Sequence, residues 1–551
     1  MPRLMPNFIL KLICSLLPLA VVFTGCTRQD MSRQDLDLQM MESASASAAA
    51  PPPEQKKSVL RLPAEDTGNR NPYSHTNVKL SVTPLLYQSL YSLDDDHIPR
   101  EVLASSMREE GRAYTITLQA GARFSDGTPV TAEDVTASLG EALKYPAVYP
   151  SLSRAVESYS ATEGGQVLIL LRQEDRNAAS LFTFPVCKSG TQSEPLPTGS
   201  GAFVLDSPTS TRMRRNPFYN GYSTVSQIPR DMETVELVPV TDGEALEYML
   251  RIGVIDFYFS ADTNADLYGY GSTELLTLNR MTFIGFNRSG TSLLRSRDLV
   301  YVIEQAINKE QMVSYAYGNL AEPVDYPFHP GYWERINGEK LLERDSPPVS
   351  SQPPDTAAGD AAVQTEPQTP QEPLSLEETM AQLGYTRQDE EGYWVRDNRG
   401  TPQRMSLRIL VNEENTSRQQ MASLLAEHLN EIGIETQIVS EAYETYLQSI
   451  AAKRFDLYFG EVHMEANMDV SRLFSSENAR AMGFEYNAAL EEAAIFLKTG
   501  QTGYKEFLTA LSDACIMEPV CYRKGSFSYS RSLPGDFITL HRELFLDIQN
   551  W

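Results

Sequence analysis

The stretch LRILVNEENTSRQQMASLLAEHLNEIGIETQIV, residues 407–439, decides the fold class of this chain. It opens with an apolar run, Leu407 to Val411, that predicts a strand, and it closes with a second predicted strand from Ile434 to Val439. A helix is predicted between them from Ser417 to Glu431, with one face formed by Met421, Leu424, Leu425, His428 and Ile432. Gly433 stands at the C′ position, where glycine readily takes the positive φ that ends a helix. This β-α-β order predicts α/β layers with parallel strands.

Earlier parts of the chain also mix strands with helices. Tyr114 to Leu118 alternates as a strand does, and a turn-rich link with an Asp126-Gly127 pair follows it. Thr131 is then predicted to be the N-cap of a helix, with Asp134 in the capping-box position. The acids of this region are therefore interpreted as turn and helix-start residues rather than as a catalytic pair.

Length and charge limit the classes of function. A chain of 551 residues is too long for one core and predicts at least two lobes. Its net charge of −26 argues against nucleic acid as a partner, because phosphate binding needs clustered Lys and Arg. The sequence has no G-x-S-x-G or H-E-x-x-H motif, and its six histidines form no ligand cluster. We therefore expect no catalysis, no cofactor and no metal.

The first 26 residues predict an export signal. Positive charge at Arg3 and Lys11 precedes an apolar run from Ile13 to Phe23, which is too short for a comfortable transmembrane helix. Phe23 to Cys26 resembles a bacterial lipobox, which implies that Cys26 carries the lipid and that the protein is anchored to the outer face of the cytoplasmic membrane. The alternative is a plain signal peptide with a chance cysteine.

Two low-complexity segments separate the rest of the chain into parts. Residues 27–57 are polar and repetitive, which predicts a flexible tether, and the alternation from Val59 predicts the start of the folded part. Residues 345–375 hold seven prolines and no aromatic residue, which predicts a disordered insert, with a domain boundary as the alternative. Outside the signal, Cys515 and Cys521 could pair, and buried free thiols are the other interpretation.

Several stretches, taken in order, resemble the family 5 extracellular solute-binding proteins, the peptide and nickel binders of ABC importers. They are Leu85–Tyr91 with Ile98-Pro99, Tyr114–Leu118 with Phe124–Val135, Pro197–Phe203 with Arg215–Tyr219, Gly285–Asn287 with Arg297–Lys309, and Leu383–Tyr385 with the β-α-β unit. The resemblance implies an α/β, two-lobe fold of the type II periplasmic-binding-protein kind, with an extra subdomain and a hinge between the lobes. It implies lobe I at 58–280 with the subdomain at about 85–195, lobe II at 281–519, and a return to lobe I at 520–551.

The candidate ligand site follows the apolar strand Phe455 to Phe459. Acids and a histidine then come close together, at Glu461, His463, Glu465 and Asp469. In an open α/β sheet, the loops at the carboxyl ends of the strands line the ligand crevice. By resemblance, Glu465 falls nearest the position that holds a ligand's ammonium group, and Asn71 and Tyr73 face the cleft. The alternatives are a solvated loop for the acids and a plain turn for Asn71 and Tyr73.

The function expected from these observations is capture of an extended solute, with a peptide as the ligand, for delivery to an ABC importer. The partners implied are the ligand, the permease subunits of the importer, and the membrane through the lipid anchor, with the chain itself a monomer. A lipoprotein of the same fold that senses peptides is the first alternative, and a surface enzyme is the second.

Overall fold

The computed structural model describes a subset of the chain: residues 59–64, 68–73, 82–94, 96–219, 233–240, 245–260, 272–318, 320–338, 340–341 and 374–530. The predicted signal peptide and tether, most of the predicted insert, and residues 531–551 of the predicted return segment lie outside the described residues. Within the described part, no helix combines the length and the apolar content that crossing a membrane requires. The described residues all belong to one unit, Lys56–Trp551.

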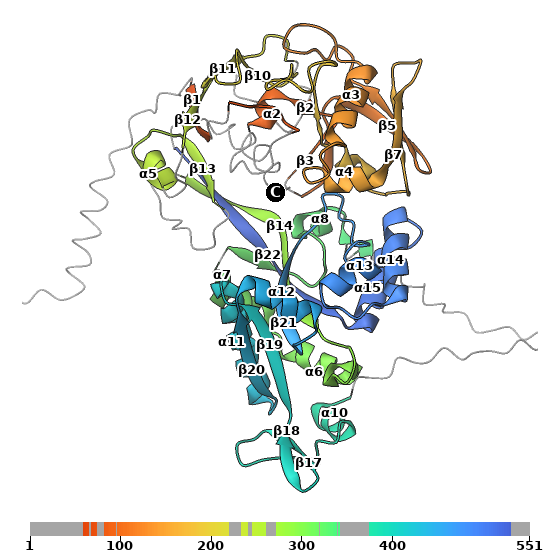
Figure 1. Cartoon of the computed structure of the whole chain (residues 1–551), viewed down its shortest axis with the longest axis vertical. Coiled ribbons are helices and arrows are strands. Elements are labelled where there is room, and N and C mark those ends of the chain that lie inside the picture. Colours follow the sequence, from red (N-terminus) through yellow and green to blue (C-terminus); the bar gives the residue numbers. More distant parts are fainter. Residues whose placement is uncertain are drawn as a thin grey trace, which may run out of the picture. The chain divides into compact units, whose positions relative to one another are not determined.

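A seven-stranded mixed sheet runs through the middle of this unit (Figure 1). Its strand order is β13-β22-β14-β21-β19-β20, and β15 pairs with β22. The strands are β13 (Phe257–Ser260), β14 (Ser272–Phe286), β15 (Ala321–Pro323), β19 (Ser406–Asn412), β20 (Glu435–Glu441), β21 (Leu457–His463) and β22 (Met517–Tyr529).

The predicted β-α-β unit is confirmed as β19, α11 (Thr416–Glu431) and β20. The two strands pair in parallel from Ser406 opposite Glu435 to Asn412 opposite Glu441, and β21 is also parallel to β19. Asn415 caps α11 by accepting a hydrogen bond from the backbone N–H of Arg418 at 2.9 Å, and Gly433 has φ +83° at the C′ position. The carboxyl ends of three parallel strands and the N-terminus of α11 therefore meet at one edge of the sheet.

Helices cover this sheet and create two hydrophobic cores. The described residues form three hydrophobic cores, of which the first lies in the N-terminal part. The second core joins β19 and α11 to α6 and contains Val300, Ile303, Leu407, Ile409, Met421 and Leu425. The third core is rich in aromatic residues and includes Phe283, Phe328, Tyr458, Phe484 and Phe507. The helices and 3₁₀ turns here are η3 (Leu293–Arg295), α6 (Arg297–Ala306), α7 (Lys309–Tyr317), α8 (Pro330–Arg335), α10 (Leu376–Gln382), α12 (Tyr443–Ala451), α13 (Ser476–Ala481), α14 (Ala488–Thr499) and α15 (Tyr504–Ala514).

A small sheet and one helix cap lie at the edges of this region. β16 (Arg387–Gln388), β17 (Trp394–Asn398) and β18 (Thr401–Arg404) form a three-stranded antiparallel sheet. Ser375, the last residue of the predicted insert, is the N-cap of α10 and forms a capping box with Glu378. The end of the predicted insert is thus part of an ordered helix start.

The N-terminal part forms the first core, which includes Leu60, Ile116, Val135, Phe184 and Phe203. Its two larger sheets have the orders β1-β12-β11-β10 and β5-β6-β8-β7. The strands are β1 (Val59–Ala64), β2 (Gln88–Ser89), β3 (Tyr91–Leu93), β4 (Pro99–Glu101), β5 (Ala104–Glu110), β6 (Ala113–Leu118), β7 (Val156–Ala161), β8 (Val167–Leu171), β9 (Pro185–Val186), β10 (Phe203–Leu205), β11 (Arg212–Arg215) and β12 (Thr234–Pro239). The helices are α2 (Thr83–Leu86), α3 (Ala132–Ala142), α4 (Pro150–Ala155), η1 (Ala178–Leu181) and α5 (Leu246–Arg251).

Local predictions in this part are confirmed. The predicted strand at Tyr114 lies within β6, and the alternating residues from Val59 form β1, the first strand of the described residues. Thr131 caps α3 in a capping box, because its side chain accepts from the backbone N–H of Asp134 and the Asp134 carboxylate accepts from the backbone N–H of Thr131 at 2.9 Å.

The cysteines of the described residues are not paired. Cys187, Cys515 and Cys521 are all buried free thiols, so the interpretation of Cys515 and Cys521 as free thiols is confirmed.

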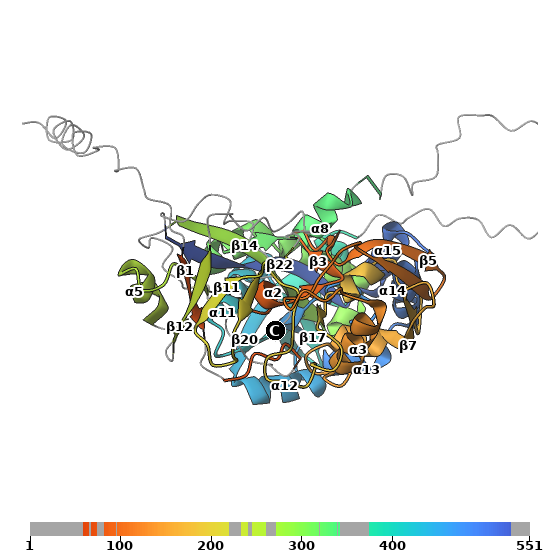
Figure 2. The ribbon, with the colours of Figure 1, turned by 90° about the horizontal axis from the view of Figure 1, so that it is seen from above.

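Two long paired strands, β14 and β22, contribute to all three cores and run side by side in both views (Figure 2). On β14, Leu276 belongs to the first core, Phe283 to the third and Phe286 to the second. Their pairing is interrupted between Thr277 and Met281. The predicted lobe boundaries at 280 and 520 fall inside these strands and stay predictions.

Candidate functional site

The predicted acidic segment begins on a strand, because β21 extends to His463 and includes Glu461 and His463, which the sequence placed after the strand; only Glu465 and Asp469 follow it. β21 ends at the exposed His463, and residues 464–475 form an irregular loop that leads to α13. The backbone N–H of Met464 donates to the carbonyl of Asn279 on β14 at 3.0 Å, which fixes the start of the loop. The loop therefore begins beside one of the two long strands.

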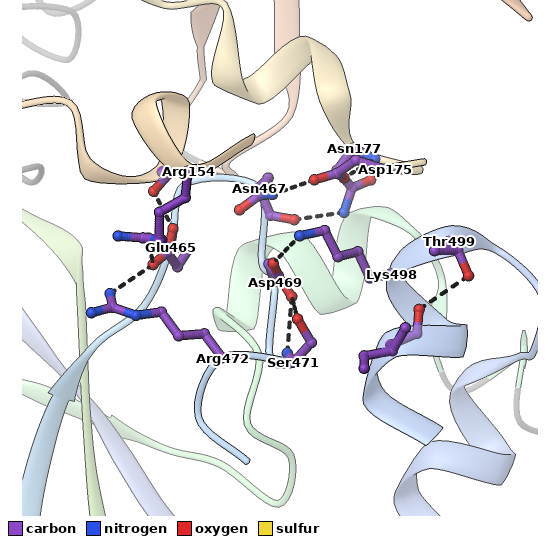
Figure 3. A network of polar contacts seen from close by, with 12 residues as sticks. Arg154, Asp175, Asn177, Glu465, Asn467, Asp469, Ser471, Arg472, Lys498 and Thr499 are labelled. Atoms are coloured by element: carbon purple, nitrogen blue, oxygen red, sulfur yellow. Dashed lines mark hydrogen bonds and ion pairs between the residues drawn. The ribbon is translucent and has the colours of Figure 1, made fainter. Parts of the chain in front are cut away.

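Glu465 joins this loop to α4. Its carboxylate accepts hydrogen bonds from the Ser151 hydroxyl and the Arg154 guanidinium, and from Arg472 Nη1 at 3.0 Å (Figure 3). The Glu465 side chain is 13% exposed, whereas those of Arg154 and Arg472 are 43% and 50% exposed. Two guanidinium groups thus supply positive charge at the position where the sequence predicted a ligand ammonium.

Asp469 forms an ion pair with Lys498 on α14. The two groups are 2.6 Å apart, and the Asp469 carboxylate also accepts from the backbone N–H of Ser471 at 2.9 Å (Figure 3). Burial lowers the pKa of Lys498, but the charge and hydrogen bond of Asp469 and the charges of Asp175 and Glu465 together outweigh burial, so the pKa is raised overall. Asp469 therefore fastens the loop to α14.

An amide and a carboxylate complete the network. Asn467 donates to the Asp175 carboxylate at 2.6 Å, and Asn177 donates to the Asn467 carbonyl at 2.8 Å and to the Tyr332 hydroxyl at 2.9 Å. Burial raises the pKa of Asp175 to about 6, although nearby Lys498 opposes the shift. The cavity beside these groups is about 10 Å³, which is room for one water molecule. This network holds together two segments, near residues 151–177 and 465–498, and the described cavity beside it is too small for a larger solute.

Glu461 lies among arginines instead. It accepts from Arg523 Nη1 at 3.2 Å, and it lies 3.5 Å from Arg280 Nη1 and 3.8 Å from Arg418 Nη2. These cations come from β22, β14 and α11, respectively. Glu461 and Glu465 are thus both surrounded by positive groups of the protein, at two separate places.

Asn71 and Tyr73 are buried residues of the N-terminal part. The Asn71 amide donates to the carbonyls of Gln192 and Glu194 at 2.6 and 2.8 Å, and the Tyr73 hydroxyl donates to the carbonyl of Pro185 at 2.7 Å. Burial raises the pKa of Tyr73 well above its ordinary value. In this structure the two residues hold the chain at 185–194, and a place for them in a ligand site stays a prediction.

Sequence reasoning missed the partners of the acids. Ser151, Arg154 and Asp175 lie about 300 residues before the loop, in a region without any motif that links them to it. Arg280 and Arg523 lie on strands, and no sequence pattern links them to Glu461. Arg418 was open to prediction, because it sits in the first turn of a helix that follows the carboxyl end of a parallel strand.

Solved structures share this fold at low sequence identity. The periplasmic murein tripeptide binding protein MppA, in its unliganded open form, superposes with a TM-score of 0.66 at 14% identity, covering 89% of this chain and 96% of MppA. A nickel ABC transporter protein from Bacillus halodurans gives 0.64 at 16% identity, covering 88% of this chain and 97% of that chain. These likenesses confirm the predicted α/β fold with two lobes of the type II periplasmic-binding-protein kind.

Curated relatives are more similar in sequence over a shorter region. Glutathione-binding protein GsiB of Salmonella choleraesuis (strain SC-B67) is 24% identical over 296 residues, which cover 49% of this chain and 55% of GsiB. GsiB of Escherichia coli (strain K12) is 25% identical over 221 residues, which cover 37% of this chain and 42% of GsiB. The chain thus matches about half the length of these relatives. Residues 98–476 match the family model described as bacterial extracellular solute-binding proteins, family 5 Middle. Because that match spans more than half of its length, the chain belongs to the bacterial extracellular solute-binding proteins of family 5.

Proposed function

We propose that this chain captures a short peptide outside the cytoplasmic membrane and delivers it to the permease of an ABC importer. The observation that carries the proposal is the family match over residues 98–476, together with the two-lobe fold. Such a fold binds a solute between its lobes and closes around it by a hinge.

A peptide is the ligand that the comparisons favour. The curated relatives are named for glutathione, itself a small peptide, and MppA for a murein tripeptide. Other structures with the same fold are named for nickel, so the fold alone does not select the ligand. The peptide assignment rests on the sequence relatives rather than on the shape.

The ligand site we propose lies at the carboxyl ends of β19, β20 and β21. Glu461, His463, Glu465 and Asp469 all lie on the end of β21 or the loop after it. A ligand ammonium would take the place of Arg154 beside Glu465, since both are cations and Arg154 is 43% exposed and free to move into water. Ligand binding and the contact of Glu465 with α4 would then exclude each other.

The test of capture is native mass spectrometry of the purified chain, followed by titration with the peptide found. A bound peptide that dissociates on partial unfolding supports the proposal. If only non-peptide solutes or none bind across pools of di- to pentapeptides, the peptide assignment fails.

Transport and sensing are separated by a second experiment. Deleting the gene in its host should abolish uptake of the bound peptide if the chain serves an importer. Normal uptake with a changed transcriptional response to the peptide would favour the sensing alternative.

We also propose that the chain is tethered through a lipid on Cys26, as the resemblance of Phe23 to Cys26 to a lipobox implies. Two acyl chains are enough for stable anchoring where one is marginal. This part of the proposal is independent of the identity of the ligand.

A further inference from the structure

A buried carboxylate lies in the contact between residues 151–177 and 465–498. Asp175 is 3% exposed and forms no ion pair with the described residues. Lys498 acts on it electrostatically but forms its ion pair with Asp469 at 2.6 Å (Figure 3). The side chains of Lys498 and Asp469 are 16% and 10% exposed, so Lys498 serves two carboxylates away from water. A buried carboxylate without its own counterion is costly when ionised and tends to take up a proton.

The partner of Asp175 has an acceptor without a donor. Asn467 is 4% exposed, and its Nδ2 donates to the Asp175 carboxylate at 2.6 Å. Its Oδ1 is buried and accepts no hydrogen bond from the described residues, although groups buried to this degree are nearly always satisfied. When Asp175 carries a proton and the Asn467 amide turns over, the acid donates to this oxygen, because the two ends of an amide have nearly the same shape. The cavity of about 10 Å³ beside them has room for one water that accepts from the amide nitrogen.

The groups around Asp175 favour its neutral form. Burial raises the pKa of Asp175 most, the charge of Lys498 lowers it, and the charge of Asp469 raises it again, which gives a value of about 6. The backbone N–H of Asn177 and the amide of Asn467 also donate to the carboxylate and lower the pKa. The titratable and charged groups packed around it are Lys498 on α14, Asp469 on the loop after β21, Tyr114 on β6, Arg176 beside it in the chain, and Tyr504 on α15.

The contact can open without disrupting a core. It consists of polar contacts, from Ser151 and Arg154 to Glu465 and from Asn177 to Asn467, which water can replace. The two segments are about 300 residues apart in the sequence. The first and third cores share no residue, so each keeps its own buried side chains when the segments separate.

We propose that this contact is a proton-gated latch, which is closed while Asp175 carries a proton and weakened when Asp175 is ionised. The proton comes from water as the latch closes and returns to water as it opens. In the open latch Asp175 is hydrated and has its ordinary pKa of 3.8, so the closed latch binds the proton at higher pH than the open one. The latch is therefore most stable below about pH 4 and weakens as the pH rises through about 6. The inference goes beyond the proposed function, because it concerns the ligand-free chain and no particular solute.

The backbone N–H of Arg176 reports on the latch directly, because it donates to the Lys498 carbonyl across the contact at 2.9 Å. Hydrogen exchange of the full, ligand-free chain is followed by mass spectrometry in peptides that cover Arg176, from pH 4 to 8. The rates are corrected for the intrinsic pH dependence of exchange. Protection should fall by roughly 100-fold as the pH rises, because 3.8 and about 6 differ by about two pKa units. Protection of β19 should show no such fall.

Three variants separate the latch from a merely structural role of the carboxylate. Asp175→Asn keeps the shape of the acid and cannot ionise, so protection at Arg176 should stay high at every pH. Asp206→Asn is the matched control, because Asp206 is 74% exposed, and it should behave like the unaltered chain. Asp469→Asn removes the charge that raises the pKa of Asp175 and leaves Lys498 to Asp175, so protection should be lost at lower pH.

Four outcomes overturn the latch. The first is protection at Arg176 that does not fall with rising pH in the unaltered chain. The second is an Asp175→Asn variant that loses protection with pH as the unaltered chain does, or that has low protection throughout. The third is an equal fall in β19, which would report opening of the whole fold. If Asp175→Asn does not fold, Asp469→Asn decides, and an unchanged pH midpoint in that variant is the fourth.

Discussion

Changing Glu465 to Gln removes one negative charge from the contact between α4 and the loop after β21 and keeps the size of the side chain. The carboxylate is 13% exposed and accepts from one hydroxyl and two guanidinium groups. Charge-assisted hydrogen bonds are worth about 1.5–3 kcal/mol each when both groups are buried. Arg154 and Arg472 are 43% and 50% exposed, so solvent screens them and they rehydrate once the carboxylate is gone.

The expected loss of unfolding free energy is therefore about 1–2 kcal/mol in all, well below the sum of two buried pairs. The matched control is Glu110→Gln, because Glu110 and its partner Arg108 are 64% and 70% exposed. That change should cost less than about 0.5 kcal/mol. The two variants differ mainly in burial of the carboxylate.

The assay is urea unfolding at low and high salt, in a double-mutant cycle with Arg154→Gln. A coupling of about 0.5–1 kcal/mol is expected between Glu465 and Arg154, and it should decrease at high salt. If Glu465→Gln costs no more than Glu110→Gln and the cycle shows no coupling, the contact with α4 does not form in solution. Glu465 would then be open to a ligand at all times.

Three further predictions rest on separate features. His329 is buried against the Thr277 carbonyl, and burial lowers its pKa from 6.5 to about 4. The unfolded chain therefore binds the proton at higher pH than the folded chain does, and stability should fall by about 3 kcal/mol as the pH drops from about 6.5 to 4, at 1.36 kcal/mol per pKa unit. His329→Asn should flatten the pH profile of the urea midpoint over that window. An unchanged profile would show that His329 is accessible to water. Cys26→Ser should release the protein from the membrane fraction or leave an unprocessed precursor, whereas normal processing with retention would count against the lipid anchor. Deleting residues 345–373 should leave the melting temperature within a few degrees, since loop shortening changes the closure free energy by only about 1 kcal/mol. A further change of Ser375 to Ala should cost about 1 kcal/mol of stability, because α10 loses its cap. Aggregation of the variant that carries only the deletion would show that the segment packs on the folded part.

The sequence predicted those parts of the fold that local chemistry decides. The periodicity from Leu407 to Val439 predicted β19, α11 and β20, because each depends on side chains close together in the chain. The cap at Thr131 was predicted for the same reason. The site was predicted only as a segment, since its acids lie at the end of β21 or in the loop after it.

The partners of the acidic residues lie far away from them in the sequence. Glu465 bonds Ser151, which lies 314 residues earlier, and no periodicity or spacing encodes such a pairing. Asn71 and Tyr73 were placed by resemblance, and their burial depends on how the chain at 185–194 packs over them. The positive group around Glu461 likewise needs three separate strands and a helix to be assembled before it exists.

The paired strands β14 and β22 limit how the three cores can move. A single connecting strand would allow one core to rotate freely about it, but two hydrogen-bonded strands resist torsion, because twisting one against the other shears the bonds between them. Bending across the pair costs least where the pairing is interrupted, between Thr277 and Met281. We therefore expect the pair to flex at this interruption rather than to twist. Arg280 sits at this interruption and also contacts Glu461, so any such flexing displaces a charge next to Arg418.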